Sequence, residues 1–211
     1  LGLAYKVDEL NQISLYVPFQ KDLSQDYKEE FFLDARLSHV LTNFWDRNGV
    51  KLSHTTSFVY PTTEGSKVRD EMYSGFELTP RVTFSALPGL NLIYMPRYRR
   101  RFHKFTSNRA GDYLVNESLL QFFVANYSFN DTWAIQSTVL YVQSRRYDGA
   151  RTEDSYLTVQ ELQLALNKTF SFATGIQTGG SLLSPERGES KTIEIFDENT
   201  SEFYASASVS F

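Results

Sequence analysis

The stretch Phe76-Glu-Leu-Thr-Pro-Arg-Val-Thr-Phe-Ser-Ala86 places an apolar residue at every second position. Side chains alternate between the two faces of a β-strand, whereas an amphipathic helix repeats its apolar residues every three to four positions. The stretch therefore predicts a strand with one apolar face. Its other face is formed by Glu77, Thr79, Arg81, Thr83 and Ser85.

The same alternation recurs along the whole chain, at 33–38, 161–167 and 203–211 among other places. Short turns near residues 10, 48, 89, 130 and 167 alternate with longer polar connections, and Asn-Gly at 48–49 suits a tight hairpin. We therefore predict one all-β, antiparallel domain over residues 1–211. Its strands are expected near 1–8, 13–20, 30–45, 50–61, 71–87, 90–104, 113–129, 132–146, 154–168, 169–183 and 191–211.

Short turns at one end and long loops at the other are typical of outer-membrane barrels. The longest apolar runs have only four residues, as at 92–95, so a spanning helix is excluded, but a barrel strand needs only alternate apolar residues. Aromatic residues flank the predicted short turns, where the boundary between water and lipid would lie. They are Phe44, Trp45, Tyr127, Phe129, Trp133, Phe170 and Phe172. These features predict a transmembrane antiparallel β-barrel in contact with the lipids of a bacterial outer membrane.

A soluble lipocalin-like barrel or sandwich is the alternative fold, but about ten alternating strands would place many polar residues in its packed core. Bacterial single-chain barrels have even strand numbers. We therefore expect twelve strands, the first of them upstream of Leu1. A barrel of ten strands, with residues 1–8 as a tail, is the other possibility.

Composition excludes several function classes. The chain has 211 residues, no cysteine, three histidines and a net charge of −4. Disulfide scaffolds and thiolate sites are excluded, and the acidic balance argues against a nucleic-acid partner. We expect no metal and no other cofactor.

The polar face of the predicted strands, which would line the barrel, carries more cations than acids. The candidate selectivity residues are Arg36, Lys51, Arg81, Arg97, Arg99, Arg101 and Arg146, with Lys6 as a further cation. The acids assigned to the same face are Asp8, Asp34, Glu77, Glu117 and Glu161. A ladder of guanidinium groups binds carboxylates and phosphates and passes anions between sites. In the alternative, Glu77, Glu117 and Glu161 neutralise the arginines in a salt-bridged plug. Inward-facing Tyr16, Phe123, Leu140 and Val142 are expected to narrow the lumen.

Two stretches resemble known outer-membrane proteins. Leu90-Asn-Leu92 and Pro96-Arg-Tyr-Arg-Arg100, after the turn Pro88-Gly89, resemble the Arg-Tyr-Arg-Tyr strand of the oligogalacturonate-specific porin family. The resemblance implies a small monomeric barrel of twelve strands for acidic sugars, in which Arg97 and Arg99 match lumen arginines and Arg101 has no clear counterpart. The final strand, ending at Phe211, resembles the C-terminal strand that the bacterial barrel-assembly machinery recognises.

These observations predict a porin, not an enzyme, that lets small anionic solutes such as acidic sugars diffuse through an arginine-lined lumen. Arg97, Arg99 and Arg101 are expected to set its charge selectivity. A closed structural or adhesive barrel whose loops bind a partner is the alternative. A lipid-modifying barrel hydrolase using His54 and Ser57 is less favoured, because these residues fall on opposite faces of a strand.

Overall fold

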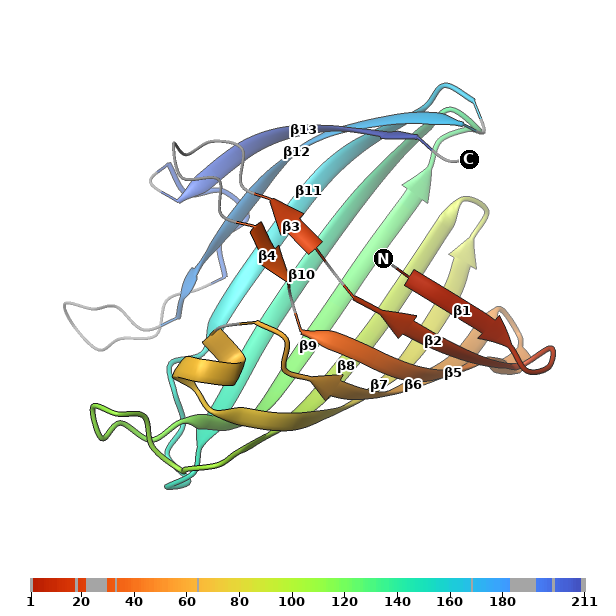
Figure 1. Ribbon diagram of the computed structural model, residues 1–211. Coiled ribbons are helices and arrows are strands. Elements are labelled where there is room, and N and C mark those ends of the chain that lie inside the picture. The colour runs from red at the N-terminus through yellow and green to blue at the C-terminus, as the bar shows by residue number, and fades with distance from the viewer. Residues whose placement is uncertain are drawn as a thin grey trace.

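The computed structural model describes residues 2–17, 19–21, 30–32, 34–63, 65–167, 169–182, 193–198 and 200–209. Eleven strands form one antiparallel sheet in which each strand pairs with its neighbour in the sequence order (Figure 1). They are β1 (Gly2–Lys6), β2 (Asn11–Tyr16), β5 (Ala35–Arg47), β6 (Val50–Tyr60), β7 (Met72–Leu87), β8 (Leu90–His103), β9 (Val115–Ser128), β10 (Trp133–Arg146), β11 (Ser155–Ala165), β12 (Phe170–Ser181) and β13 (Ser201–Val209). A separate hairpin joins β3 (Phe19–Lys21) to β4 (Glu30–Phe32), and one π-helical turn, η1, covers Gly65–Arg69. The all-β antiparallel prediction is confirmed.

The connections fall into two classes at opposite ends of the sheet. Short turns follow β1, β5, β7, β9 and β11, at what we call the turn end, and longer segments follow β2, β6, β8, β10 and β12, at the loop end. In the β5–β6 turn both Asn48 (φ 53°) and Gly49 (φ 76°) adopt the left-handed conformation, which matches the right-handed strand twist of a hairpin. In the described part of the chain, no helix is long and apolar enough to cross a membrane.

The sheet is curved but not closed in the part of the chain that the structure describes. β1 and β13 are its two edge strands, and each pairs with one neighbour only (Figure 1). β1 pairs with β2 from Gly2 opposite Tyr16 to Lys6 opposite Gln12. The ten-strand alternative, in which residues 1–8 form a tail, is therefore wrong. Phe211, the residue of the assembly-signal prediction, lies outside the described residues.

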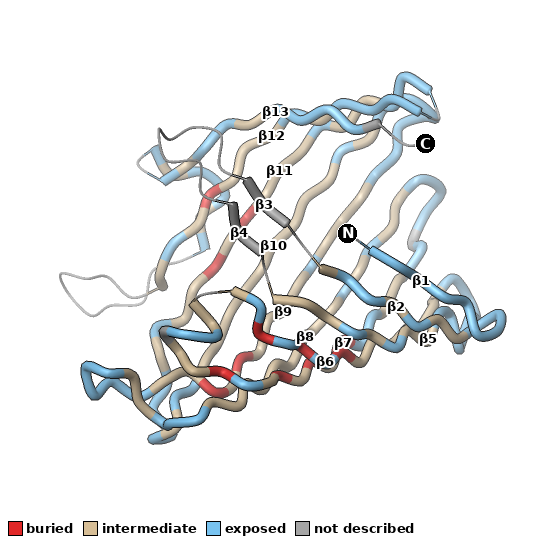
Figure 2. The backbone as a smooth tube through the Cα atoms, viewed as in Figure 1, coloured by how far each residue is buried: buried red, intermediate tan, exposed pale blue. Residues whose placement is uncertain are grey.

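Over β6 to β9, the curvature gives the sheet a crowded concave face and a more open convex face. On β6, Ser57 and Val59 are 5% and 7% exposed, whereas the intervening Phe58 is 62% exposed. Figure 2 shows buried positions alternating with exposed or intermediate ones along the strands near β6 and β7. Among the described elements, contacts join sheet neighbours, apart from η1 against β7, so no second layer causes this difference. Side chains converge on the inner side of a curved sheet, which places Ser57 and Val59 on the concave face. The strand register extends this face across the sheet, from Ser57 through Glu77 and Arg99 to Ser118.

The convex face is apolar and exposed except at β11 and β12, where Thr158 and Thr178 are 0% exposed and donate hydrogen bonds to the backbone oxygens of Glu194 and Ile195. Its large exposed residues include Leu37, Phe58, Phe84, Leu92, Tyr94, Phe123, Ile135, Leu162 and Phe203. The aromatic residues predicted beside the short turns, from Phe44 to Phe172, are exposed as well. An exposed apolar surface of this extent is uncommon on a protein that is surrounded by water alone.

At the loop end, the carboxylate of Asp34 holds the start of β5 against the connection between β6 and β7. It accepts hydrogen bonds from the Thr62 and Thr63 backbone N–H groups, at 3.0 and 3.2 Å, and from the Ser66 hydroxyl at 2.7 Å. Burial alone would raise the pKa of Asp34, but these donors outweigh it and hold the pKa below the ordinary value. The connection is thus fixed by a carboxylate that is ionised at neutral pH.

We expect the hydrogen bonds between Asp34 and the β6–β7 connection to break in acid. A group whose pKa is lower in the folded protein stabilises it fully above the ordinary pKa, here 3.8, and loses that effect as the pH falls through the lower folded value. The protection factors of the Thr62 and Thr63 amides against hydrogen exchange, relative to unprotected amides at the same pH, should therefore fall in that acidic window. In Asp34→Asn the same amides should exchange faster already at neutral pH. Equal exchange in the variant and the wild type at neutral pH would contradict this role.

Candidate functional site

An arginine cluster lies on the concave face towards the loop end. We define it as Arg36 of β5 and Arg97, Arg99 and Arg101 of β8, together with Glu77 of β7. The three arginines of β8 occupy every second position, so they share one face at a spacing of about 7 Å. Register places Arg99 directly opposite Glu77. The cluster is thus assembled from three strands.

Glu77 is the shared carboxylate of this cluster. The Arg99 Nε donates to Glu77 Oε1 at 2.6 Å, and a terminal nitrogen of Arg36 lies 4.0 Å from the same oxygen. The Glu77 side chain is only 4% exposed. Four guanidinium groups and one carboxylate leave the cluster with a formal charge of +3. The salt-bridged plug is therefore realised only in part, because Glu77 neutralises one arginine out of four.

Arg97 and Arg36 retain unused hydrogen-bonding capacity. The Nε of each is buried and has no acceptor within the described part of the chain. The Arg97 guanidinium instead lies over the Phe122 ring, 5.2 Å from its centroid. Buried donors are normally paired. Two unpaired guanidinium donors on one concave face therefore suit an anionic ligand.

Beside Arg97, the backbone ladder between β7 and β8 is interrupted. Pairing stops after Leu78 opposite Tyr98 and resumes at Val82 opposite Tyr94. The same register places Pro80 opposite Pro96, and neither residue has a backbone N–H to donate. At Pro96 and Arg97, β8 is paired with β9 alone.

Arg101 also lines a cavity of about 550 Å³ at the loop end, together with Arg146 and His103. Asp70 and Asp112 line the same cavity. Arg146 reaches it through a register shift between Arg145 and Arg146, where one residue of β9, Asn116, is unmatched in β10. The cavity thus combines cationic and acidic groups at the mouth of the concave face.

The remaining two candidate selectivity residues lie apart from the cluster. Lys51 is near the turn end, 3.4 Å from a carboxylate oxygen of Asp46, and both side chains are largely exposed. Arg81 lies on the concave face of β7 opposite Ser53 and is exposed. The alternation thus assigned these side chains to the correct face but did not show how they group.

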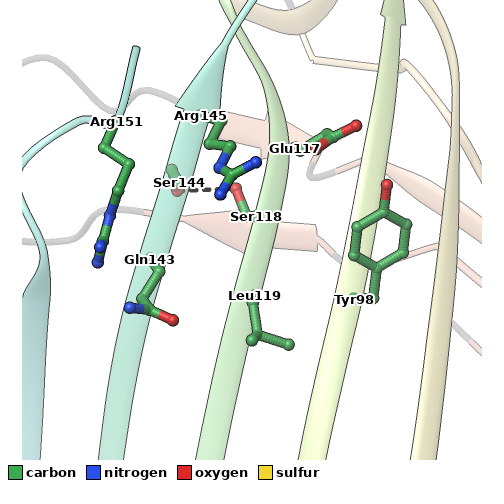
Figure 3. A pocket seen from close by; sticks show the side chains of 8 residues that line it. All are labelled: Tyr98, Glu117, Ser118, Leu119, Gln143, Ser144, Arg145 and Arg151. Carbon is green, nitrogen blue, oxygen red and sulfur yellow. Dashed lines mark hydrogen bonds between the residues drawn. The ribbon is translucent and has the colours of Figure 1, made fainter. Parts of the chain in front are cut away.

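Glu117 corrects the sequence analysis. It lies on the convex face, where it forms an ion pair with Arg100, its partner in the register. It lines a cavity of about 300 Å³ between β8, β9 and β10, together with Tyr98, Arg145 and Arg151 (Figure 3). The Ser118–Ser144 hydrogen bond of 2.9 Å runs across the adjacent strands (Figure 3). Glu117 therefore does not neutralise the arginine cluster.

Two further expectations concern the narrowing residues and the hydrolase alternative. Phe122, not Phe123, is on the concave face, because Phe122 pairs with Met95 and Leu140 in the rows that continue from Arg97 and Arg99. His54 lies on the convex face, 2.8 Å from Thr56, whereas Ser57 lies on the concave face. The two cannot act as a catalytic pair.

Within the described residues, no three acidic or histidine side chains form a group suited to a metal ion.

Glu161 is likewise not a partner of the arginines. The Tyr204 hydroxyl donates to it at 2.7 Å, from β13 to β11 across β12. Sequence analysis missed this contact, since it depends on strand register rather than on any local motif. The concave face therefore has an acidic side at β11–β13, opposite the cationic side at β5–β8.

Comparison with known proteins adds no family assignment: no protein-family model and no curated protein matches the chain. The resemblance to the oligogalacturonate-specific porins consequently depends on the quoted residues alone.

Proposed function

We propose that the chain forms a transmembrane β-barrel of a bacterial outer membrane and acts as a passive channel for small anionic solutes. The observation that carries the proposal is the +3 arginine cluster on the concave face of a sheet whose convex face is apolar. A soluble barrel would have the opposite arrangement, with its apolar side chains packed inside. The apolar convex face suits the acyl chains of lipids.

Closure of this barrel requires one more strand. β1 and β13 both run from the loop end to the turn end, so direct pairing of these edges would be parallel. A strand antiparallel to both would close the sheet with twelve strands and place both chain ends at the turn end. We propose that this strand precedes β1 in the natural protein. It would also remove two open edges, which cannot exist within hydrocarbon.

Anion selectivity follows from the cluster's excess positive charge. Cations in a narrow lumen with low-dielectric walls raise the local concentration of anions. Arg36, Arg97 and Arg101 carry this excess, because Glu77 is occupied by Arg99. Small acidic sugars are one solute class that such a lumen would pass, in line with the resemblance of the β8 sequence.

Single-channel recording in planar bilayers tests the proposal. We expect the full natural chain to give discrete conductance steps, with a reversal potential in a KCl gradient that indicates preference for chloride. A protein that inserts into the bilayer but conducts no current would contradict the channel, and would favour a closed barrel with an adhesive role. A cation preference would contradict the role of the arginine cluster.

A further inference from the structure

The concave face carries an apolar patch beside the arginine cluster. The patch consists of Ile93 and Met95 of β8, Leu120, Phe122 and Val124 of β9, Leu140 and Val142 of β10, and Leu157 and Val159 of β11. Register aligns Met95, Phe122, Leu140 and Leu157 in one row across the four strands. Adjacent strands are about 4.8 Å apart, so the row extends over about 14 Å. This length suits an alkyl chain or an aromatic ring.

The patch and the cluster form one continuous surface. Arg97 lies opposite Leu120, which lies opposite Val142. The Arg97 guanidinium also contacts the Phe122 ring of the patch. A hydrated inorganic anion or a sugar acid would use the arginines alone, and would leave these nine apolar side chains in contact with water. A ligand with a charged end and an apolar end would use both parts.

Two acidic residues beyond the patch restrict which part of a ligand can carry negative charge. Glu161 on β11 and Glu202 on β13 lie on the concave face, and their hydrogen bonds are to neutral groups, Tyr204 and Gln177. In the described part of the chain, neither forms an ion pair with a cation. A ligand with anionic groups along its whole length would meet these carboxylates. A ligand with one anionic end would not.

We propose that the concave face binds an amphipathic monoanion, whose carboxylate is held at Arg97 and whose apolar tail lies on the patch. The proposal rests on the channel function above and, among small anionic solutes, favours medium-chain or aromatic carboxylates over acidic sugars. The unpaired Arg97 Nε supplies a hydrogen bond to the carboxylate. Burial of the tail against the patch supplies the remaining affinity, which grows with each methylene group removed from water.

Comparing octanoate with gluconate, both monocarboxylates, distinguishes the contribution of the apolar patch from that of the arginines. In recordings of the full natural chain, octanoate should reduce the chloride current at concentrations about tenfold or more below those of gluconate. Leu140→Ser combined with Val142→Ser should abolish this difference, and Arg97→Gln should weaken block by both anions. Val40→Ser is the matched control, because Val40 is on the concave face of β5 outside the patch and should leave the octanoate effect unchanged.

Equal potency of octanoate and gluconate in the wild type would overturn the proposal, as would an unchanged octanoate effect in the Leu140→Ser/Val142→Ser variant. Failure of the channel itself is recognised separately, since a wild type without current disproves conduction only. In that case, saturation-transfer NMR of octanoate with the protein in lipid nanodiscs measures binding directly. A signal that is stronger for the wild type and Val40→Ser than for the double variant supports the site, and equal signals overturn it.

Discussion

Replacing Arg97 and Arg101 together with glutamine should remove most of the chloride preference of the channel without unfolding the sheet. Neither arginine has an ion-pair partner in the described part of the chain, whereas Arg99 is held by Glu77. The exchange lowers the formal charge of the arginine cluster from +3 to +1. Glutamine keeps part of the length and hydrogen-bonding capacity of arginine, so packing beside Phe122 is largely retained. Lumen substitutions of this kind tune selectivity, while charges on the lipid face destabilise a barrel.

The reversal potential in a KCl gradient measures the effect. It should move towards zero in the variant, and the shift should be larger in dilute salt, since the screening length is about 30 Å at 0.01 M and about 10 Å at 0.1 M. Lys51→Gln is the matched control, because Lys51 lies on the same face but is already paired with Asp46. An unchanged potential at low salt in the double variant would show that Arg97 and Arg101 do not set selectivity.

The fold was largely predictable because a strand has a period of two. Alternation over 76–86 assigns Glu77 and Arg81 to one face whatever the register, and the structure keeps them there. The chain turns also follow from local chemistry, as at Asn48 and Gly49. Closure of the sheet could not be predicted from local sequence, since it depends on the relative directions of the two edge strands.

The site was less predictable wherever both faces of a strand are mixed. In β9, polar residues occur on both parities, with Glu117 and Gln121 on one and Ser118 and Asn126 on the other. The local sequence does not determine which of these two sets lies on the concave face, whereas pairing with β8 does. The position of Arg146 likewise depends on a register shift that the local sequence does not reveal. The sequence analysis also treated Arg97, Arg99 and Arg101 as equivalent, but only the register opposite β7 shows that Arg99 alone faces Glu77.

That difference among the arginines predicts a large loss of stability at Arg99. Arg99→Gln leaves the carboxylate of Glu77, 4% exposed, with Arg36 at 4.0 Å as its nearest cation. Breaking a buried ion pair by removing one partner costs about 3–5 kcal/mol, whereas removing both partners costs much less. We expect Arg99→Gln to lower the free energy of unfolding by about 3 kcal/mol. Glu77→Gln combined with Arg99→Gln should lose less than Arg99→Gln alone.

Urea unfolding from lipid vesicles, followed by the fluorescence of Trp45 and Trp133, measures both variants and the Glu77→Gln single variant in one cycle. The exposed pair of Lys51 and Asp46 is the control, with side chains 44% and 52% exposed. Lys51→Gln should change the unfolding free energy by less than about 1 kcal/mol, as expected for a surface pair. Additive losses for Glu77→Gln and Arg99→Gln would show that the two side chains do not stabilise each other. The coupling predicted here arises because Arg99→Gln removes the hydrogen-bonded ion-pair partner of a carboxylate that is only 4% exposed, whereas the double variant removes both partners. Arg97 and Arg101 do not take part in this pair.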